Sequence, residues 1–177
     1  GWTSVASKAS AAEYYNNAQL NYIFKNTKYS IEGNGAVCYW SGKWHKIAKM
    51  QITFKGDGAL DIKATCNDGP DHASKGKWEL GDGKICLTIH NRQISHKMFK
   101  NSPTCKRVKK GRFGIELYGS NGNREYSTRI ISHPLAASRE ELFAALKTVS
   151  QEADLTKRNK RKGQARAELE RKQEEEA

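Results

Sequence analysis

The sequence predicts a mainly β protein: a small antiparallel barrel preceded by an N-terminal helix and followed by a C-terminal helix and tail. First, short runs of alternating apolar and polar residues recur from residue 28 to residue 132. Second, turns rich in Gly, Asn and Asp interrupt these runs about every 8–12 residues, as in sandwiches and up-and-down barrels. Third, all four cysteines lie in this stretch, which indicates a disulfide-bonded domain from an oxidising compartment.

An N-terminal helical segment is expected over residues 1–26, with the helix itself over residues 9–25. Ser10 is a suitable N-cap, and aromatic residues such as Tyr15 and Tyr22 recur at roughly helical spacing. These residues would give the helix one apolar face.

The barrel is expected over residues 27–133. Its predicted strands are 28–32, 36–40, 44–54, 59–66, 75–80, 84–90, 104–108, 112–118 and 124–132. Trp78 lies between Lys77 and Glu79, so the period of two in a strand turns Trp78 toward the core. A filled barrel interior is predicted from five large side chains: Trp40, Trp44, Trp78, Phe54 and Phe113.

Residues 134–177 are expected to form an amphipathic helix followed by a charged tail. Ser138 and Glu141 make a capping-box pattern at the start of the helix. An apolar stripe follows, which either docks on the barrel or binds a protein partner: Leu142, Leu146 and Val149. After Leu155 apolar residues are rare, so the tail is either a solvated helix or disordered.

The four cysteines are expected to form two disulfides. The favoured pairing is Cys38 with Cys66 and Cys86 with Cys105, because each bond then closes a local stretch of neighbouring strands. The alternative of four buried free thiols in a cytosolic protein stays open. No C-x-x-C pair is present, which argues against a zinc knuckle or a thioredoxin-type site.

The segment from Gly76 to Leu87 contains a Gly-x-Trp strand followed by the motif Asp-Gly-Lys-Ile-Cys-Leu. A second cysteine, Cys105, follows 19 residues after Cys86 and precedes a basic turn. In these features the chain resembles short secreted lipocalin-like β-barrel proteins of proteobacteria, many in families of unknown function. The resemblance extends over residues 20–132 and is specific over residues 76–108. It implies a small barrel in the periplasm or outside the cell, without a catalytic motif.

The chain departs from the pattern of these families at several positions. Lys77 replaces the usual small residue, and Lys106 replaces the aromatic residue that follows the second cysteine. Cys38 and Cys66 are additional. The resemblance therefore supports the fold and leaves the activity open.

A periplasmic or secreted location is expected. The chain starts at Gly1 and its first residues lack an apolar signal core, so we expect a product whose signal peptide has been removed. No window of the sequence approaches 18 consecutive apolar residues, so no transmembrane segment is expected.

Positive charge is the strongest functional signal in the sequence. Residues 1–132 hold 21 Lys+Arg and 10 Asp+Glu, a net +11 of the total +12. Candidate binding residues form the core of the densest cluster: Lys106, Arg107, Lys109, Lys110 and Arg112. A field of this sign attracts an anionic envelope lipid, a glycan or an acidic protein. The alternative is a generally basic surface with no dedicated partner.

Trp40 and Trp44 are further candidate binding residues, because they alternate with the cations Lys43 and Lys46. Aromatic rings beside positive charge can stack on nucleobases or sugar rings. The competing interpretation, which the alternation favours, is that these rings pack in the core.

No catalytic residue, metal ligand or cofactor site is predicted. Ser, His and Asp occur without a nucleophile-elbow motif, and the histidines share no metal-ligand spacing. Asp68 and Asp71 lie with His72 in a Gly-Pro turn, where turn formation explains the composition. The sequence thus favours a non-enzymatic binding module of the cell envelope. Two alternatives remain: a nucleic-acid-binding protein, and an inhibitor of a secreted hydrolase that uses the loop over residues 91–103.

Overall fold

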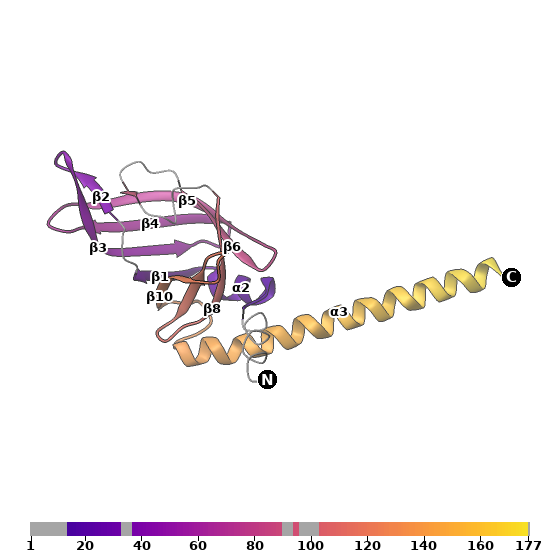
Figure 1. Cartoon of the computed structure of the whole chain (residues 1–177). Helices are drawn as coiled ribbons and strands as arrows, with labels where there is room; N and C mark the ends of the chain where they lie inside the picture. Colours follow the sequence, from indigo (N-terminus) through magenta and orange to yellow (C-terminus); the bar gives the residue numbers. More distant parts are fainter. Residues whose placement is uncertain (1–13, 33–36, 90–93, 96–102, 177) are drawn as a thin grey trace, which may run out of the picture.

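The computed structural model describes residues 14–32, 37–89, 94–95 and 103–176. Its centre is an antiparallel sheet that closes into an eight-stranded barrel (Figure 1). The barrel order is β1, β10, β9, β8, β6, β5, β4 and β3, and β1 pairs with β3 to close the ring. The predicted fold class is therefore confirmed.

Most predicted strands agree with the observed ones. The barrel strands are β1 (Thr27–Glu32), β3 (Lys43–Phe54), β4 (Ala59–Cys66), β5 (Asp71–Gly81), β6 (Lys84–Ile89), β8 (Thr104–Lys110), β9 (Ile115–Tyr118) and β10 (Arg124–Ser132). The short strands β2 (Val37–Trp40) and β7 (Ile94–Ser95) extend the sheet beyond β3. No prediction covered β7, because two residues carry no detectable periodicity.

Aromatic side chains fill the barrel interior. The Phe54 and Trp78 rings lie 6.0 Å apart, and Phe24 from the N-terminal helix packs 4.7 Å from Phe54. Trp78 is only 8% exposed, and its indole N–H donates to the Lys55 carbonyl oxygen at 2.8 Å. Tyr29 donates to the Ile23 carbonyl oxygen at 2.6 Å, and burial raises the pKa of its hydroxyl well above the usual value.

Three of the five residues predicted for the core lie elsewhere: Phe113, Trp44 and Trp40, which is half-buried and outside the core cluster. Phe113 is 48% exposed and Trp44 is 51% exposed. Phe113 precedes β9 in a turn that the Gly111 N–H closes on the Gly114 carbonyl oxygen at 2.8 Å. Only glycine fits at Gly114, since a Cβ there would lie 2.4 Å from the Thr128 carbonyl oxygen. The predicted strand over residues 112–118 therefore starts later than expected.

The N-terminal helix α2 (Asn17–Phe24) is shorter than predicted. Its N-cap is Asn16, which forms a capping box with Gln19 at 2.9 Å in both directions. The predicted N-cap Ser10 lies outside the described residues. Buried side chains of α2 belong to the barrel core: Leu20, Ile23 and Phe24.

The C-terminal helix α3 (Arg139–Glu175) starts at the predicted N-cap. The Ser138 hydroxyl accepts from the Glu141 backbone N–H at 3.2 Å. The Glu141 carboxylate accepts from the Ala137 N–H at 2.8 Å, one residue before the position that the capping-box pattern predicts.

The apolar stripe of α3 packs within the molecule. Leu142 and Leu146 are buried with Phe143, and Gln19 of α2 donates to the Leu146 carbonyl oxygen at 3.1 Å. Val149 is half-buried. Of the two alternatives left open for this stripe, docking on the rest of the molecule is the one observed for Leu142 and Leu146. Their buried surface is not available to a protein partner.

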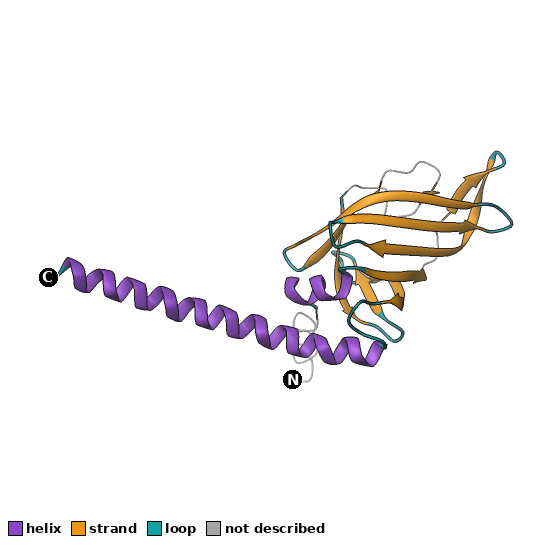
Figure 2. Ribbon diagram, turned by 180° about the vertical axis from the view of Figure 1, so that it is seen from behind, coloured by secondary structure: helices purple, strands orange, loops and turns teal. Residues whose placement is uncertain are grey.

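Beyond Leu155 the charged tail is an exposed helix, which matches one of the two alternatives left open. Figure 2 shows α3 projecting away from the barrel as a single straight rod. None of the helices in the described ranges is both long and apolar enough to cross a bilayer.

Both predicted disulfides are present. Cys38–Cys66 ties β2 to the end of β4, and Cys86–Cys105 joins directly paired residues of β6 and β8. The half-cystines of the first bond are buried, whereas Cys105 of the second is exposed. The favoured pairing is confirmed.

Candidate anion-binding site

Strand β8 carries four of the five predicted basic binding residues, and alternation splits them between its two sides. Val108 is buried, so Lys106, two positions away, points to the same side. Lys106 is 17% exposed and forms an ion pair with Glu125. Its charge is therefore neutralised locally. Lys106 lies on the Val108 side of the strand, as alternation predicts, and not with Arg107 and Lys109.

Lys110 and Arg112 also lie apart from the rest of the predicted cluster. The Lys110 ammonium lies 4.9 Å from the Phe143 ring centre, next to α3. Arg112 lies 5.2 Å from the Phe113 ring centre. The strand ends at Lys110 and the chain then turns, so the prediction of one exposed patch of Arg107, Lys109, Lys110 and Arg112 is wrong.

Arg107 and Lys109 remain on the outer face of β8. Arg107 pairs with Tyr118 of β9, and Tyr118 pairs in turn with Arg124 of β10. On the other side of β8, the pairing of Cys86 with Cys105 brings Lys84 opposite Arg107. An outer row of cations and one tyrosine thus crosses four strands.

Tyr14 covers this row from the N-terminal segment. The Tyr15 N–H donates to the Val108 carbonyl oxygen at 3.0 Å, which holds the segment against β8. The Tyr14 ring meets Tyr118 edge to face at 5.8 Å. Arg107 lies 5.4 Å and Lys109 4.6 Å from the Tyr14 ring centre, so cation–π contacts fix both side chains.

Tyr118 keeps its proton at neutral pH. Burial, and then the hydrogen bond to the Glu116 carboxylate at 2.8 Å, raise the pKa of its hydroxyl. Glu116 also pairs with Arg124 at 3.4 Å. This carboxylate lies beside Tyr118 on the same face of β9 and is engaged by Tyr118 and Arg124, so Lys84 and Arg107 have no acidic partner among the described residues.

A depression of ≈ 190 Å³ lies between these side chains. Its lining is Tyr14, Lys84, Cys105, Arg107, Tyr118, Gly119, Ser120 and Gly122. Two cations and the hydroxyl groups of Tyr14 and Ser120 are therefore available as donors, whereas the Tyr118 hydroxyl already donates to Glu116. None of the described residues in this lining bears a carboxylate. This chemistry suits a phosphate, sulfate or carboxylate group.

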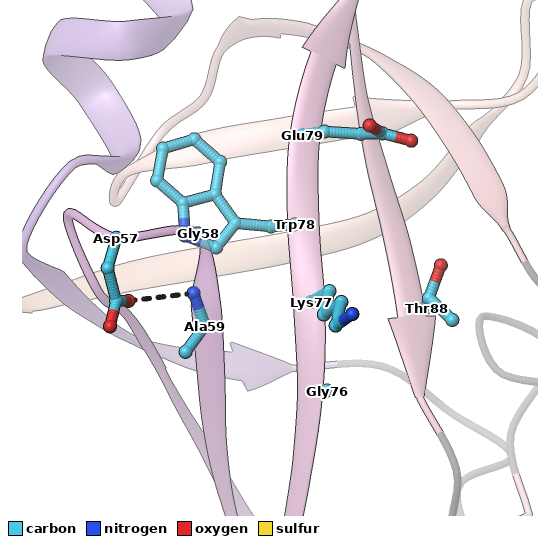
Figure 3. A pocket seen from close by; sticks show the side chains of 8 residues that line it. All are labelled: Asp57, Gly58, Ala59, Gly76, Lys77, Trp78, Glu79 and Thr88. Atoms are coloured by element: carbon cyan, nitrogen blue, oxygen red, sulfur yellow. Dashed lines mark hydrogen bonds between the residues drawn. The ribbon is translucent and has the colours of Figure 1, made fainter.

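Three other depressions of the described surface mix both signs of charge. The one in Figure 3, ≈ 450 Å³, combines Lys77 with Asp57 and Glu79, and the Asp57 carboxylate accepts from the Ala59 N–H. A second, ≈ 530 Å³, combines three lysines with Asp61 and Asp71. A third, ≈ 230 Å³, combines two arginines with Glu116. Of these four depressions, the one at Arg107 is thus the best suited to an anion.

The candidate residues Trp40 and Trp44 lie on opposite faces of the β2–β3 hairpin. Trp44 is exposed and pairs across the strands with exposed Tyr39, so the prediction of core packing is wrong for Trp44. Trp40 is half-buried against Gly69, and its ring lies 4.9 Å from His45. Neither tryptophan lies at the depression beside Arg107.

His72 lies beside a disulfide rather than in an acidic cluster. Its ligand atom and the sulfurs of Cys38 and Cys66 lie within 4.8 Å of one another. Because these sulfurs are bonded to each other, they are not thiolates and do not supply metal ligands. Asp71 instead pairs with Lys63 at 3.4 Å and accepts from the Thr65 hydroxyl at 2.8 Å.

Sequence reasoning missed four side chains that line the depression: Tyr14, Lys84, Tyr118 and Ser120. The cross-strand register would have revealed Lys84 and Tyr118, since both flank Arg107 once the cysteine pairing aligns β6 with β8. Tyr14 has no sequence signal of this kind. Most of the predicted inhibitory loop, residues 91–103, lies outside the described residues.

Fold and site together define a class of protein: a small disulfide-bonded β-barrel with a cation-lined depression on its outer face. Comparison with known proteins adds no relative, because no family model, curated protein or solved structure matches the chain.

Proposed function

We propose that this protein is a non-enzymatic binding module of the cell envelope that holds an anionic group of its partner at Arg107 and Lys84. The observation that carries the proposal is the depression whose lining combines both cations with Tyr14, Tyr118 and Ser120 and with no described carboxylate. The partner is an envelope lipid, a glycan or an acidic protein, and the shared chemistry is phosphate, sulfate or carboxylate.

Three features support a binding role rather than catalysis. Rings already brace Arg107 and Lys109, so little side-chain entropy is lost when an anion binds. No histidine lines any of the four depressions of the described surface, so their Ser and Thr hydroxyls lack an imidazole base there. The net charge of +12 steers anionic partners toward the molecule.

A periplasmic or secreted location fits this role. Two disulfides are compatible with an oxidising compartment. The resemblance of residues 76–108 to short secreted lipocalin-like barrels points the same way.

Charge reversal tests the site. We expect the double variant Lys84→Glu, Arg107→Glu to weaken binding to a heparin matrix roughly a hundredfold, because two charge-assisted contacts are lost. The measurement is the salt concentration of elution together with titration calorimetry. Vesicles of phosphatidylglycerol, polyglutamate and a single-stranded oligonucleotide serve as parallel probes to distinguish lipid, protein and nucleic-acid partners.

A matched control separates a site from generic charge. Lys75→Glu, Lys77→Glu changes two exposed cations of β5 and gives the same net charge, +8 instead of +12. We expect this control to bind within a few-fold of the parent. Equal losses in both double variants would show that only net charge matters and that the depression is not a site.

A further inference from the structure

The β2–β3 hairpin carries a second candidate surface, separate from the depression at Arg107. β3 and β8 lie on opposite sides of the barrel, with three strands between them in either direction around the ring. Figures 1 and 2 both show the hairpin extending past the barrel at the end away from the tip of α3. Any role of the hairpin is therefore independent of the anion site.

The hairpin presents a pair of exposed aromatic rings. Tyr39 is 43% exposed and Trp44 51% exposed, and they face each other across the strands with ring centres 5.4 Å apart. Their planes meet at 64°, edge to face. In an edge-to-face pair, the edge of one ring covers the face of the other. The pair therefore lacks the parallel open faces on which successive nucleobases stack.

Exposed lysines flank this pair within the hairpin. Lys43, Lys46 and Lys49 are all exposed, and Lys46 lies on the same face as Trp44 because the two are two positions apart in β3. The sequence from residue 33 to residue 56 contains no Asp or Glu. A second copy of this hairpin would be repelled, whereas an anionic surface would be attracted.

The hairpin is held rigidly. Ser41 and Gly42 have φ values of 53° and 78°, which form the tight turn that suits paired strands. The Cys38–Cys66 bond and the Asn67 N–H, which donates to the Lys46 carbonyl oxygen at 2.8 Å, tie the hairpin to the barrel. The exposed rings are thus presented by an ordered element, which reduces the entropy lost on binding.

We infer that the hairpin anchors the protein at the surface of an anionic lipid bilayer, with Tyr39 and Trp44 in the headgroup layer. Tyr and Trp are the side chains that favour this layer, since each combines an apolar ring with a polar group. Lys43 and Lys46 then meet the anionic headgroups, which attract nearby cations. α3 projects from the opposite end of the molecule, away from the membrane.

Vesicle binding tests this inference. The probe is vesicles of phosphatidylcholine with phosphatidylglycerol, and the readouts are co-sedimentation and quenching of tryptophan fluorescence by brominated acyl chains. We expect Tyr39→Ala, Trp44→Ala to lower the partition coefficient at least tenfold, since two rings no longer leave water. Trp44→Phe should retain binding and lose most of the quenching.

Controls make each outcome decisive. Phe113→Ala removes a ring of similar exposure, covered by Arg112 and Arg129, and should bind like the parent. Lys84→Glu, Arg107→Glu should retain the Trp44 quenching, so failure of the anion site and failure of the anchor are distinguishable. The inference is overturned if Tyr39→Ala, Trp44→Ala partitions like the parent. It is also overturned if the variant still binds vesicles like the parent and loses only its binding to a single-stranded oligonucleotide.

Discussion

Trp78→Ala is expected to lower the free energy of unfolding by roughly 3–5 kcal/mol, because it leaves a cavity in the aromatic cluster between α2 and the barrel strands. The Trp78 ring contacts both Phe54 and Phe24, so its loss loosens the packing of α2 on the barrel. Its N–H also satisfies the Lys55 carbonyl oxygen, which would be left without that donor. Urea unfolding followed by far-UV circular dichroism measures the change.

Two variants show which part of the side chain matters. Trp78→Phe preserves most of the apolar contact and loses the hydrogen bond, so we expect an intermediate loss of about 1–3 kcal/mol. Trp44→Ala removes an exposed indole and should change the free energy of unfolding by less than about 1 kcal/mol. A loss below about 1 kcal/mol in Trp78→Ala would mean that this strand has its faces reversed.

Loss of either disulfide is the second large effect that we expect. The bonds span 28 and 19 residues, and closing loops of this size stabilises a fold by roughly 3–4 kcal/mol in the chain-entropy model. Cys38→Ala, Cys66→Ala should cost more than Cys86→Ala, Cys105→Ala. Cys38 and Cys66 are both buried, so their sulfurs leave a cavity, whereas Cys105 is exposed.

Thermal unfolding of the two double variants, both measured without reductant, gives this comparison. Non-reduced peptide mapping of the parent should show the same two bonds. The reverse order of stability would contradict the burial of Cys38–Cys66. Free thiols in protein isolated from an oxidising compartment would contradict the disulfides themselves.

Barrel strands were predictable because a closed sheet with one buried face imposes a period of two on the sequence. The predicted bounds of β4 and β10 coincide with the observed ones, and Trp78 faces inward as expected. The pattern fails where the chain has no core to face. Trp44 belongs to a hairpin that runs past the barrel, and Phe113 to a turn that glycine allows to approach β10 closely.

The candidate site was predictable only in part, because sequence proximity is not proximity on a sheet. Alternation correctly separates Lys106 from Arg107 and Lys109, and Lys106 pairs with Glu125. The remaining cations look like one patch in the sequence, yet the turn after Lys110 separates Arg112. The neighbours of Arg107 come instead from other strands and from the N-terminal segment. These neighbours are set by the strand register and by the packing of the N-terminal segment on β8, neither of which can be deduced from local periodicity.

Titration with inorganic sulfate, followed by amide chemical shifts in a ¹⁵N-labelled sample, tests the anion site most directly. We predict saturable shifts confined to the lining of the depression, at Lys84, Arg107, Tyr118, Ser120 and Gly122. These shifts should disappear in Lys84→Glu, Arg107→Glu and persist in Lys75→Glu, Lys77→Glu. Shifts spread evenly over the basic surface, or centred on another depression, would contradict the assignment of this site.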